Sequence, residues 1–267
     1  MKRTLLSIAG YDPSGGAGAL LDVRVFAALG FHGAAILTAL TVQNTQKVLK
    51  VIPFPPRTVT DQYLALDKDM AFAGIKVGML GSQGVVPPLG RILTRHPDIP
   101  RVVDPVLKAS SGDPLFEKKG ISALLRAVRG NASLLTPNME EASVIAGMAV
   151  RTPQDMREAA RVLFGLTDIP CLVKGGHLEK SAVNILFDGH RTAVFGHEKI
   201  ARDVHGTGCF LSSAILGYLA KGHSLEKACG LASDMVHAAI LASVKPGKGR
   251  RAFWFSPGEP GSRPRKT

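Results

Sequence analysis

The 267-residue chain contains few cysteines. Cys171, Cys209 and Cys229 form no CxxC pair and no spacing typical of a disulfide framework. This excludes the small disulfide-rich secreted domains, and a reducing cytoplasmic location is expected.

Long apolar runs are also missing. The run after the basic N-terminus, Thr4–Ala9, is too short for a signal-peptide core and for a membrane span. Later apolar runs have the length of a strand or are interrupted by glycine. The sequence therefore predicts no membrane segment.

Acidic residues are scarce, with 21 Asp and Glu against 33 Lys and Arg, which gives a net charge of +12. Half of this excess lies in residues 244–267, which hold seven Lys or Arg and one Glu. This Pro/Gly-rich segment is typical of a solvated end, so no nucleic-acid partner is expected. We predict one domain over residues 1–245 and a basic tail over residues 246–267.

Short apolar strands alternate with helical patterns along the rest of the chain. The first unit runs from a strand at 4–9 through a helix at 19–29 to a strand at 34–40. The later expected segments are an edge hairpin or flap (41–51), strands (74–77, 101–103, 132–135, 171–174), a hairpin (183–187 with 191–195) and helices (58–70, 82–95, 117–128, 139–146, 153–164, 209–220, 225–243). The pattern predicts an α/β domain with a mostly parallel sheet, whose ligands bind beyond the carboxyl ends of the strands.

Polar residues stand at several of these strand ends. Asp104 follows a buried strand, and Asn138 and Glu141 share one side of a helix start. One interpretation is helix capping; the other is an oxygen-rich Mg²⁺ site. Lys174 precedes two glycines and could place its ammonium group on a phosphate.

The turn His205-Gly206-Thr207-Gly208-Cys209 precedes an apolar helix. Gly206 and Gly208 permit a tight turn, and Thr207 is a candidate N-cap. The free N–H groups of a helix start favour an anion, and the same field is expected to lower the pKa of Cys209. The alternative is an ordinary helix entry with a buried cysteine.

The glycine loop at 15–18 excludes two nucleotide-binding classes. It lacks the Lys-Ser/Thr of a Walker A loop and does not fit GxGxxG. We therefore do not expect a dinucleotide-dependent dehydrogenase.

Seven motifs in order resemble the hydroxymethylpyrimidine/phosphomethylpyrimidine kinase family of thiamine biosynthesis. The resemblance covers about residues 4–245. Its motifs are Gly10-Tyr11-Asp12-Pro13-Ser14-Gly15-Gly16-Ala17-Gly18, Thr38-Ala39 with Gln43-Asn44-Thr45, Lys76-Val77-Gly78-Met79-Leu80, Val103-Asp104-Pro105-Val106, Leu135-Thr136-Pro137-Asn138 with Glu141-Ala142, Lys174-Gly175-Gly176-His177, and the turn at 205–209.

The resemblance implies a three-layer α/β/α ribokinase-like fold and a homodimer. It also implies ATP- and Mg²⁺-dependent phosphorylation of 4-amino-5-hydroxymethyl-2-methylpyrimidine and then of its monophosphate. The implied residues are catalytic (Cys209 as base, with Gly206, Thr207 and Gly208), substrate-binding (Gly10, Asp12, Gln43, Met79, Val106), ATP-binding (Lys174, His177, His205, Thr207) and metal-organising (Asp104, Asn138, Glu141).

Three other functions stay open at this point. A pyridoxal kinase would share the fold and the Gly-Thr-Gly-Cys turn, although Gln43 and Met79 favour a pyrimidine. A hydrolase or transferase using Cys209 with His205 or His177 would give Lys174 no role. A catalytically silent pyrimidine-binding regulator would not need Asp104, Glu141, Lys174 and Cys209 together.

Overall fold

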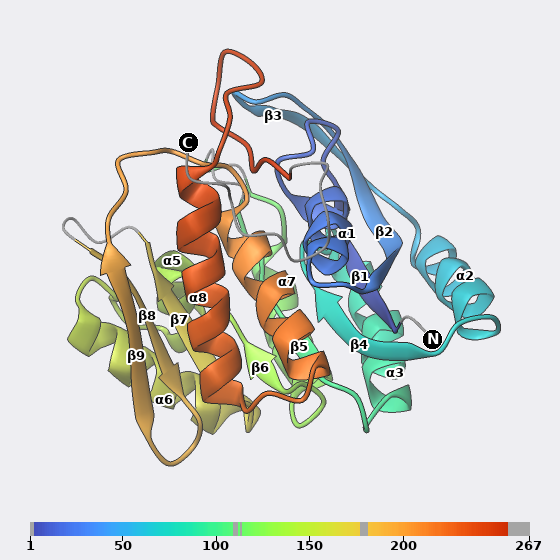
Figure 1. The fold of residues 1–267 in the computed structure, drawn as a ribbon. Helices are drawn as coiled ribbons and strands as arrows, with labels where there is room; N and C mark the ends of the chain where they lie inside the picture. The colour runs from blue at the N-terminus through green and yellow to red at the C-terminus, as the bar shows by residue number, and fades with distance from the viewer. Residues whose placement is uncertain (1–2, 109–111, 113, 177–180, 256–267) are drawn as a thin grey trace.

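The computed structural model describes residues 3–108, 112, 114–176 and 181–255. Within them the chain forms one sheet of nine strands in the order β3-β2-β1-β4-β5-β6-β7-β8-β9 (Figure 1). Pairing is parallel from β2 to β7 and antiparallel for β3 at one edge and for β8 and β9 at the other. The strands are β1 (Thr4–Tyr11), β2 (His32–Gln43), β3 (Val48–Pro53), β4 (Phe72–Val77), β5 (Arg101–Val103), β6 (Leu134–Leu135), β7 (Cys171–Gly175), β8 (Ser181–Phe187) and β9 (Thr192–Glu198).

Helices cover both faces of this sheet. On one face, α1, α7 and α8 share a core with Leu5 of β1 and Val102 of β5; on the other, α2 to α6 pack on Ile8 and Ile75 (Figure 1). The helices are α1 (Gly18–Ala28), α2 (Pro56–Asp67), α3 (Val86–Arg95), α4 (Ile121–Val128), α5 (Met139–Ala146), α6 (Pro153–Thr167), α7 (Thr207–Ala220) and α8 (Leu225–Leu241), with short 3₁₀ turns at Gln83–Val85 and Lys118–Gly120.

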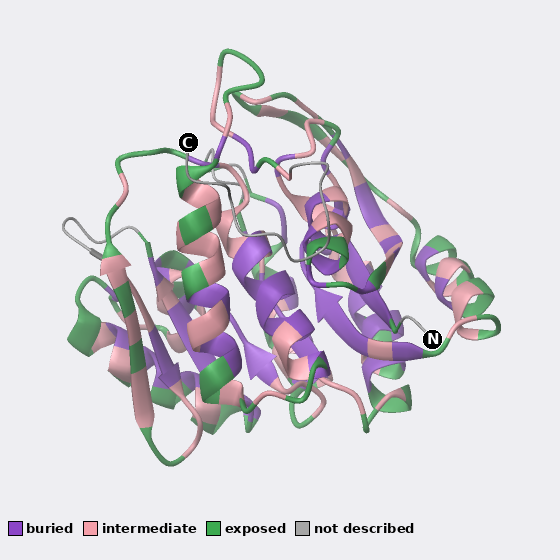
Figure 2. Cartoon of the chain, viewed as in Figure 1, coloured by how far each residue is buried: buried purple, intermediate pink, exposed green. Residues whose placement is uncertain are grey.

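Burial explains why the central strands are continuous apolar runs. In β1 every residue from Thr4 to Gly10 is buried, because helices pack on both sides of it. Figure 2 shows the same concentration of buried residues in the central strands and on α7. The predicted three-layer, mostly parallel α/β fold is confirmed. No helix in the described part of the chain has the length and apolarity of a membrane span.

Several helix boundaries differ by a few residues from the sequence prediction, and two of the helix starts differ for a clear physical reason. The helix expected at 82–95 is divided, with a 3₁₀ turn before α3, and Pro87 and Pro88 lie in the first turn of α3, where the N–H that proline lacks has no partner in any case. The N-cap of α7 is Gly206, not Thr207. Gly206 has φ +82°, and a Cβ there would collide with the carbonyl oxygen of Gly16. Only glycine suits this position.

The C-terminal segment after α8 packs on the domain. Phe253 is 2% exposed and lies 4.6 Å from Phe210 of α7, between ring centroids. The backbone N–H of Arg250 donates to the carbonyl oxygen of Thr45 at 2.8 Å, and Val244 pairs with Ala252. The folded domain therefore extends at least to Phe253, beyond the expected boundary at residue 245. The basic charges of this segment predict a solvated tail, whereas the buried ring of Phe253 holds it on the domain.

We predict that Phe253→Ala destabilises the protein by about 3–5 kcal/mol, because it removes a buried ring and leaves a cavity. Trp254→Ala is the matched control, since Trp254 is 54% exposed and its loss is expected to cost no more than about 0.5 kcal/mol. Urea unfolding of both variants measures the difference. Equal stabilities would show that the segment does not contribute to the core.

Candidate active site

The N-terminal turn of α7 lies over the carboxyl ends of the parallel strands. On one side Gly206 touches the loop after β1 at Gly16. On the other side Gly208 faces the end of β7, where a Cβ on Gly208 would lie 3.0 Å from Nζ of Lys174. The turn therefore joins two groups of predicted site residues.

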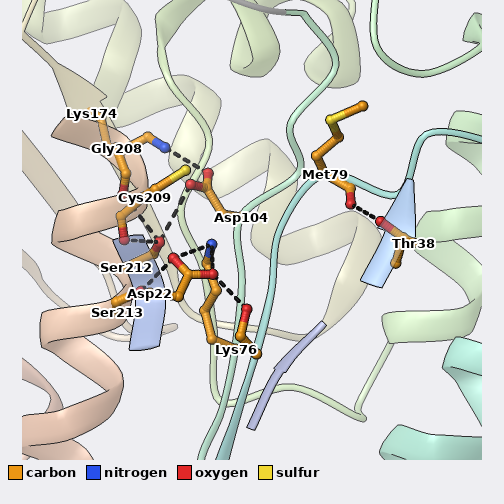
Figure 3. A network of polar contacts seen from close by, with 11 residues as sticks. Asp22, Thr38, Lys76, Met79, Asp104, Lys174, Gly208, Cys209, Ser212 and Ser213 are labelled. Carbon is orange, nitrogen blue, oxygen red and sulfur yellow. Dashed lines mark hydrogen bonds and ion pairs between the residues drawn. The ribbon is translucent and has the colours of Figure 1, made fainter. Parts of the chain in front are cut away.

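Lys174 and Asp104 form the centre of the first group. Lys174 Nζ donates to Asp104 Oδ1 at 2.6 Å, and the two side chains are 11% and 2% exposed. Burial alone would lower the pKa of Lys174, but Asp104 and Glu141 outweigh it, so the pKa is raised and the ammonium group stays charged. Figure 3 shows this pair beside Gly208 and Cys209 at the start of α7. A fixed positive charge thus stands next to a helix N-terminus.

Asn138 and Glu141 form a capping box at the start of α5. Asn138 N–H donates to Glu141 Oε2 at 2.8 Å, and Glu141 N–H donates to Asn138 Oδ1 at 2.9 Å. Glu141 is buried, and burial raises its pKa to about 7 despite the opposing effect of Lys174. The capping interpretation is therefore confirmed; it places a buried carboxyl group within electrostatic reach of Lys174 and Asp104.

The donor chemistry of this group fits a hydrated Mg²⁺ ion. Across the described residues, no cluster of three or more His, Cys, Asp or Glu side chains could enclose a metal. Asp104 and Glu141 nevertheless interact electrostatically, as the effect of Asp104 on the pKa of Glu141 shows. Mg²⁺ commonly binds one or two carboxylates and completes its shell with water and phosphate oxygens, which this pair allows.

Asp12 and His205 join the loop after β1 to the turn before α7. His205 Nε2 lies 3.2 Å from Asp12 Oδ2, and Asp12 also accepts from the N–H groups of Ser14 and Ala17. Burial raises the pKa of Asp12, but hydrogen bonds from His205, Ser14 and Gln43 outweigh it, so the pKa is lowered. The predicted ATP residue His205 therefore contacts the predicted substrate residue Asp12.

The remaining predicted substrate residues also lie close together. A Cβ on Gly10 would approach Sδ of Met79 to 2.8 Å, so the Met79 side chain packs directly against Gly10. Thr38 Oγ1 fixes Met79 by donating to its carbonyl oxygen at 2.7 Å (Figure 3), and Val106 packs in the same small cluster. The structure thus gathers Gly10, Met79 and Val106, next to the Asp12 and Gln43 pair.

The expectation of a lowered pKa for Cys209 is wrong. Burial raises the pKa of its thiol, the positive charge of Lys76 opposes this, and Asp22 and Asp104 raise it further. Desolvation and two nearby carboxylates outweigh the helix N-terminus. Cys209 is a neutral thiol at rest near neutral pH.

His177 lies outside the described residues, whereas Thr207 is the first residue of α7. The sequence analysis missed a buried ion pair between Lys76 of β4 and Asp22 of α1. The signal for it is a lone lysine inside the apolar strand β4 and an aspartate on the apolar side of α1, where Asp22 is buried with Leu21 and Val25.

Comparison with known proteins identifies the family. Residues 12–254 match the family described as phosphomethylpyrimidine kinase. The chain belongs to this family. A hydroxymethylpyrimidine/phosphomethylpyrimidine kinase of Aquifex aeolicus is 39% identical over 252 residues, which cover 94% of this chain and 99% of that protein.

Solved structures agree with this assignment. A phosphomethylpyrimidine kinase from Clostridium difficile has a TM-score of 0.78 at 33% identity, covering 90% of this chain and all of that one. A pyridoxal kinase from Bacillus subtilis, solved as an ADP complex, has a TM-score of 0.87 at 28% identity, covering 95% and 97%. The predicted family, ribokinase-like fold and phosphotransferase class are confirmed.

The raised pKa of Glu141 predicts a pH-dependent stability. The protonated carboxyl group of Glu141 is favoured in the folded state. Its contribution to the free energy of unfolding is therefore fully present below pH 4.5 and is lost as pH rises through about 7. Gln cannot titrate. We therefore compare the free energies of unfolding of Glu141→Gln and of the wild type. The difference, variant minus wild type, is expected to increase from pH 5 to pH 8 by on the order of 2–3 kcal/mol.

Denaturant melts without magnesium or nucleotide measure this difference. Glu140→Gln is the matched control, because the Glu140 side chain is 73% exposed. A constant difference for Glu141→Gln across this range would contradict the assigned shift.

Proposed function

We propose that this protein uses ATP and Mg²⁺ to phosphorylate 4-amino-5-hydroxymethyl-2-methylpyrimidine and then its monophosphate in thiamine biosynthesis. The observation that carries the proposal is the Lys174–Asp104 pair at the N-terminus of α7, beside the Gly10, Met79 and Val106 cluster. A cationic phosphate site and an apolar ring site thus flank one helix start.

Phosphoryl transfer needs positioning and charge neutralisation more than covalent chemistry by the protein. Lys174 would bind phosphate oxygens of ATP, with His177 and His205 as further proposed contacts. The N–H groups at the start of α7, from Gly206 to Gly208, would hold the charge on the transferred group. Asp104 and Glu141 would hold Mg²⁺, with Asn138 organising its waters. The ion neutralises phosphate charge when bound.

The substrate hydroxyl oxygen attacks the terminal phosphorus of ATP, the bond to the ADP oxygen breaks, and the hydroxyl proton passes to Cys209. This role requires the thiolate. Since the pKa of Cys209 is raised, the thiol must lose its proton before it can act. The rate of transfer is therefore expected to increase with pH above neutrality.

Gln43 would read the pyrimidine, because a carboxamide both donates to a ring nitrogen and accepts from an amino group. The Gln43 side chain is hydrogen-bonded to Asp12, so the loop after β1 would help to orient the carboxamide toward the ring. Met79 and Val106 would pack on the ring faces, and Gly10 leaves space for them. We also propose that the enzyme acts in the cytoplasm as a homodimer.

A pyridoxal kinase is the second candidate function. The high TM-score of the Bacillus subtilis pyridoxal kinase supports it, whereas the identity to pyrimidine kinases is higher. Both substrates present a hydroxymethyl group on a six-membered nitrogen heteroaromatic ring. The fold therefore does not separate them.

Release of ADP with three acceptors separates the candidates. The hydroxymethylpyrimidine and its monophosphate are expected to turn over faster than pyridoxal. Pyridoxal turnover alone would replace the pyrimidine assignment. No turnover with any acceptor, in a protein that still binds the pyrimidine, would indicate the silent regulator.

Cys209→Ala is expected to lower kcat by about 10²–10⁴-fold, because the proton acceptor is lost. The KM for the pyrimidine should change little, since Gly10, Gln43 and Met79 remain. Cys229→Ala is the matched control, because Cys229 is a buried thiol of α8. Wild-type kcat in Cys209→Ala would remove Cys209 as the base.

A further inference from the structure

A buried charged cluster lies directly beneath the candidate active site. Lys76 Nζ of β4 lies 3.0 and 2.9 Å from the two carboxylate oxygens of Asp22 of α1, and both side chains are 0% exposed. Ser7 of β1 donates to Asp22 Oδ2 at 2.6 Å, and Ser213 of α7 donates to Oδ1 at 2.8 Å. Four elements of the fold therefore meet at one carboxylate.

Stability does not account for this cluster. Removing two charges from water is costly, and a fully buried ion pair is often no more stable than apolar side chains of the same size. Burial lowers the pKa of Lys76, but Asp22 outweighs it, so the pKa is raised and the charge persists. An apolar pair would have been sufficient to fill this space.

The position of the cluster indicates what it does. Ser213 comes four residues after Cys209, so the two side chains lie on the same face of α7, one turn apart. Ser7 and Lys76 are register partners on adjacent parallel strands. A Cβ on Gly78 would lie 2.7 Å from Lys76 Nζ, so the ammonium group also touches the segment that leads into Met79. Figure 3 shows Asp22 between Lys76 and Ser213, below Cys209 and Asp104.

The cluster therefore connects α7 with α1, β1 and β4 through hydrogen bonds to one carboxylate. Under the proposed function, the start of α7 must present its N–H groups to the transferred phosphoryl group and Cys209 to the attacking hydroxyl group, while the segment after β4 places Met79 at the ring pocket. Misplacement of reacting groups by about 1 Å can cost about 10²-fold in rate. Directional hydrogen bonds to a charged acceptor fix a helix against a strand better than apolar contacts, because their geometry is specific.

We propose that Lys76 and Asp22 are positioning residues for phosphoryl transfer, which hold the first two turns of α7 against the middle of β1 and the end of β4. This inference rests on the proposed kinase function. It predicts that loss of the pair lowers kcat while substrate binding and the fold persist.

The test uses the double variant Lys76→Met with Asp22→Asn in the full-length protein. Either single change disturbs a buried charge balance and endangers folding. The double variant removes both charges, and the Asn amide can accept from one serine hydroxyl through its oxygen and donate to the other through its nitrogen. Its Tm is expected within about 5 °C of wild type. Its kcat should fall at least about tenfold, with KM for ATP and for the pyrimidine within about twofold.

Two further variants complete the design. Ser213→Ala removes only the link to α7, keeps the ion pair and is expected to lower kcat at unchanged KM. Val128→Ala truncates a buried residue at the far end of α4 and is expected to lower Tm without changing kcat. A folded double variant with wild-type kcat overturns the proposal. If the double variant does not fold, wild-type kcat in Ser213→Ala overturns it instead.

The proposed function fails separately. Wild-type protein that phosphorylates none of the three acceptors removes the kinase function. Wild-type turnover together with an unimpaired double variant removes only the positioning role.

Discussion

The close approach of two backbone segments determines the geometry of this protein. Gly206, at the start of α7, touches the carbonyl oxygen of Gly16 in the loop after β1. After that loop Gly18, the first residue of α1, has φ +60°, and its Cβ position is filled by the carbonyl oxygen of Gly10. A side chain at Gly206 would push α7 away from the loop, and one at Gly18 would push α1 away from the end of β1. Because α7 approaches the sheet so closely, its first turn contacts both the loop after β1, at Gly16, and the end of β7, at Lys174.

Charge compensation is the second constraint on the site. Lys174 with Asp104 and Lys76 with Asp22 are two buried pairs, one above the other along α7. Each pair keeps a positive charge near Cys209 and the helix N-terminus, where phosphate would bind. Each also brings a carboxylate that raises the pKa of the thiol. The two carboxylates thus favour a neutral Cys209 thiol at rest. The two lysines keep positive charge at the same helix start.

The fold is shared by enzymes named as kinases of a pyrimidine and of pyridoxal. The overall fold is common to this chain and to the pyrimidine and pyridoxal kinases that it resembles. Under the proposed function, the choice of ring would fall to side chains such as Gln43, at the end of β2, and Met79, just after β4. A change in a few contacts there would alter the acceptor without altering the catalytic turn.

The sequence alone determined the order of strands and helices, because apolar runs such as Thr4–Ala9 and glycine punctuation are local signals. It also placed Asp104, Asn138, Glu141 and Lys174 at one sheet edge, since parallel strands share their carboxyl ends. Only the tertiary structure decided the pKa of Cys209, because desolvation depends on neighbours distant in sequence. The tertiary structure also decided that Lys76 pairs with Asp22 and that Phe253 packs on Phe210. Each contact joins segments far apart in the sequence, which no local pattern relates.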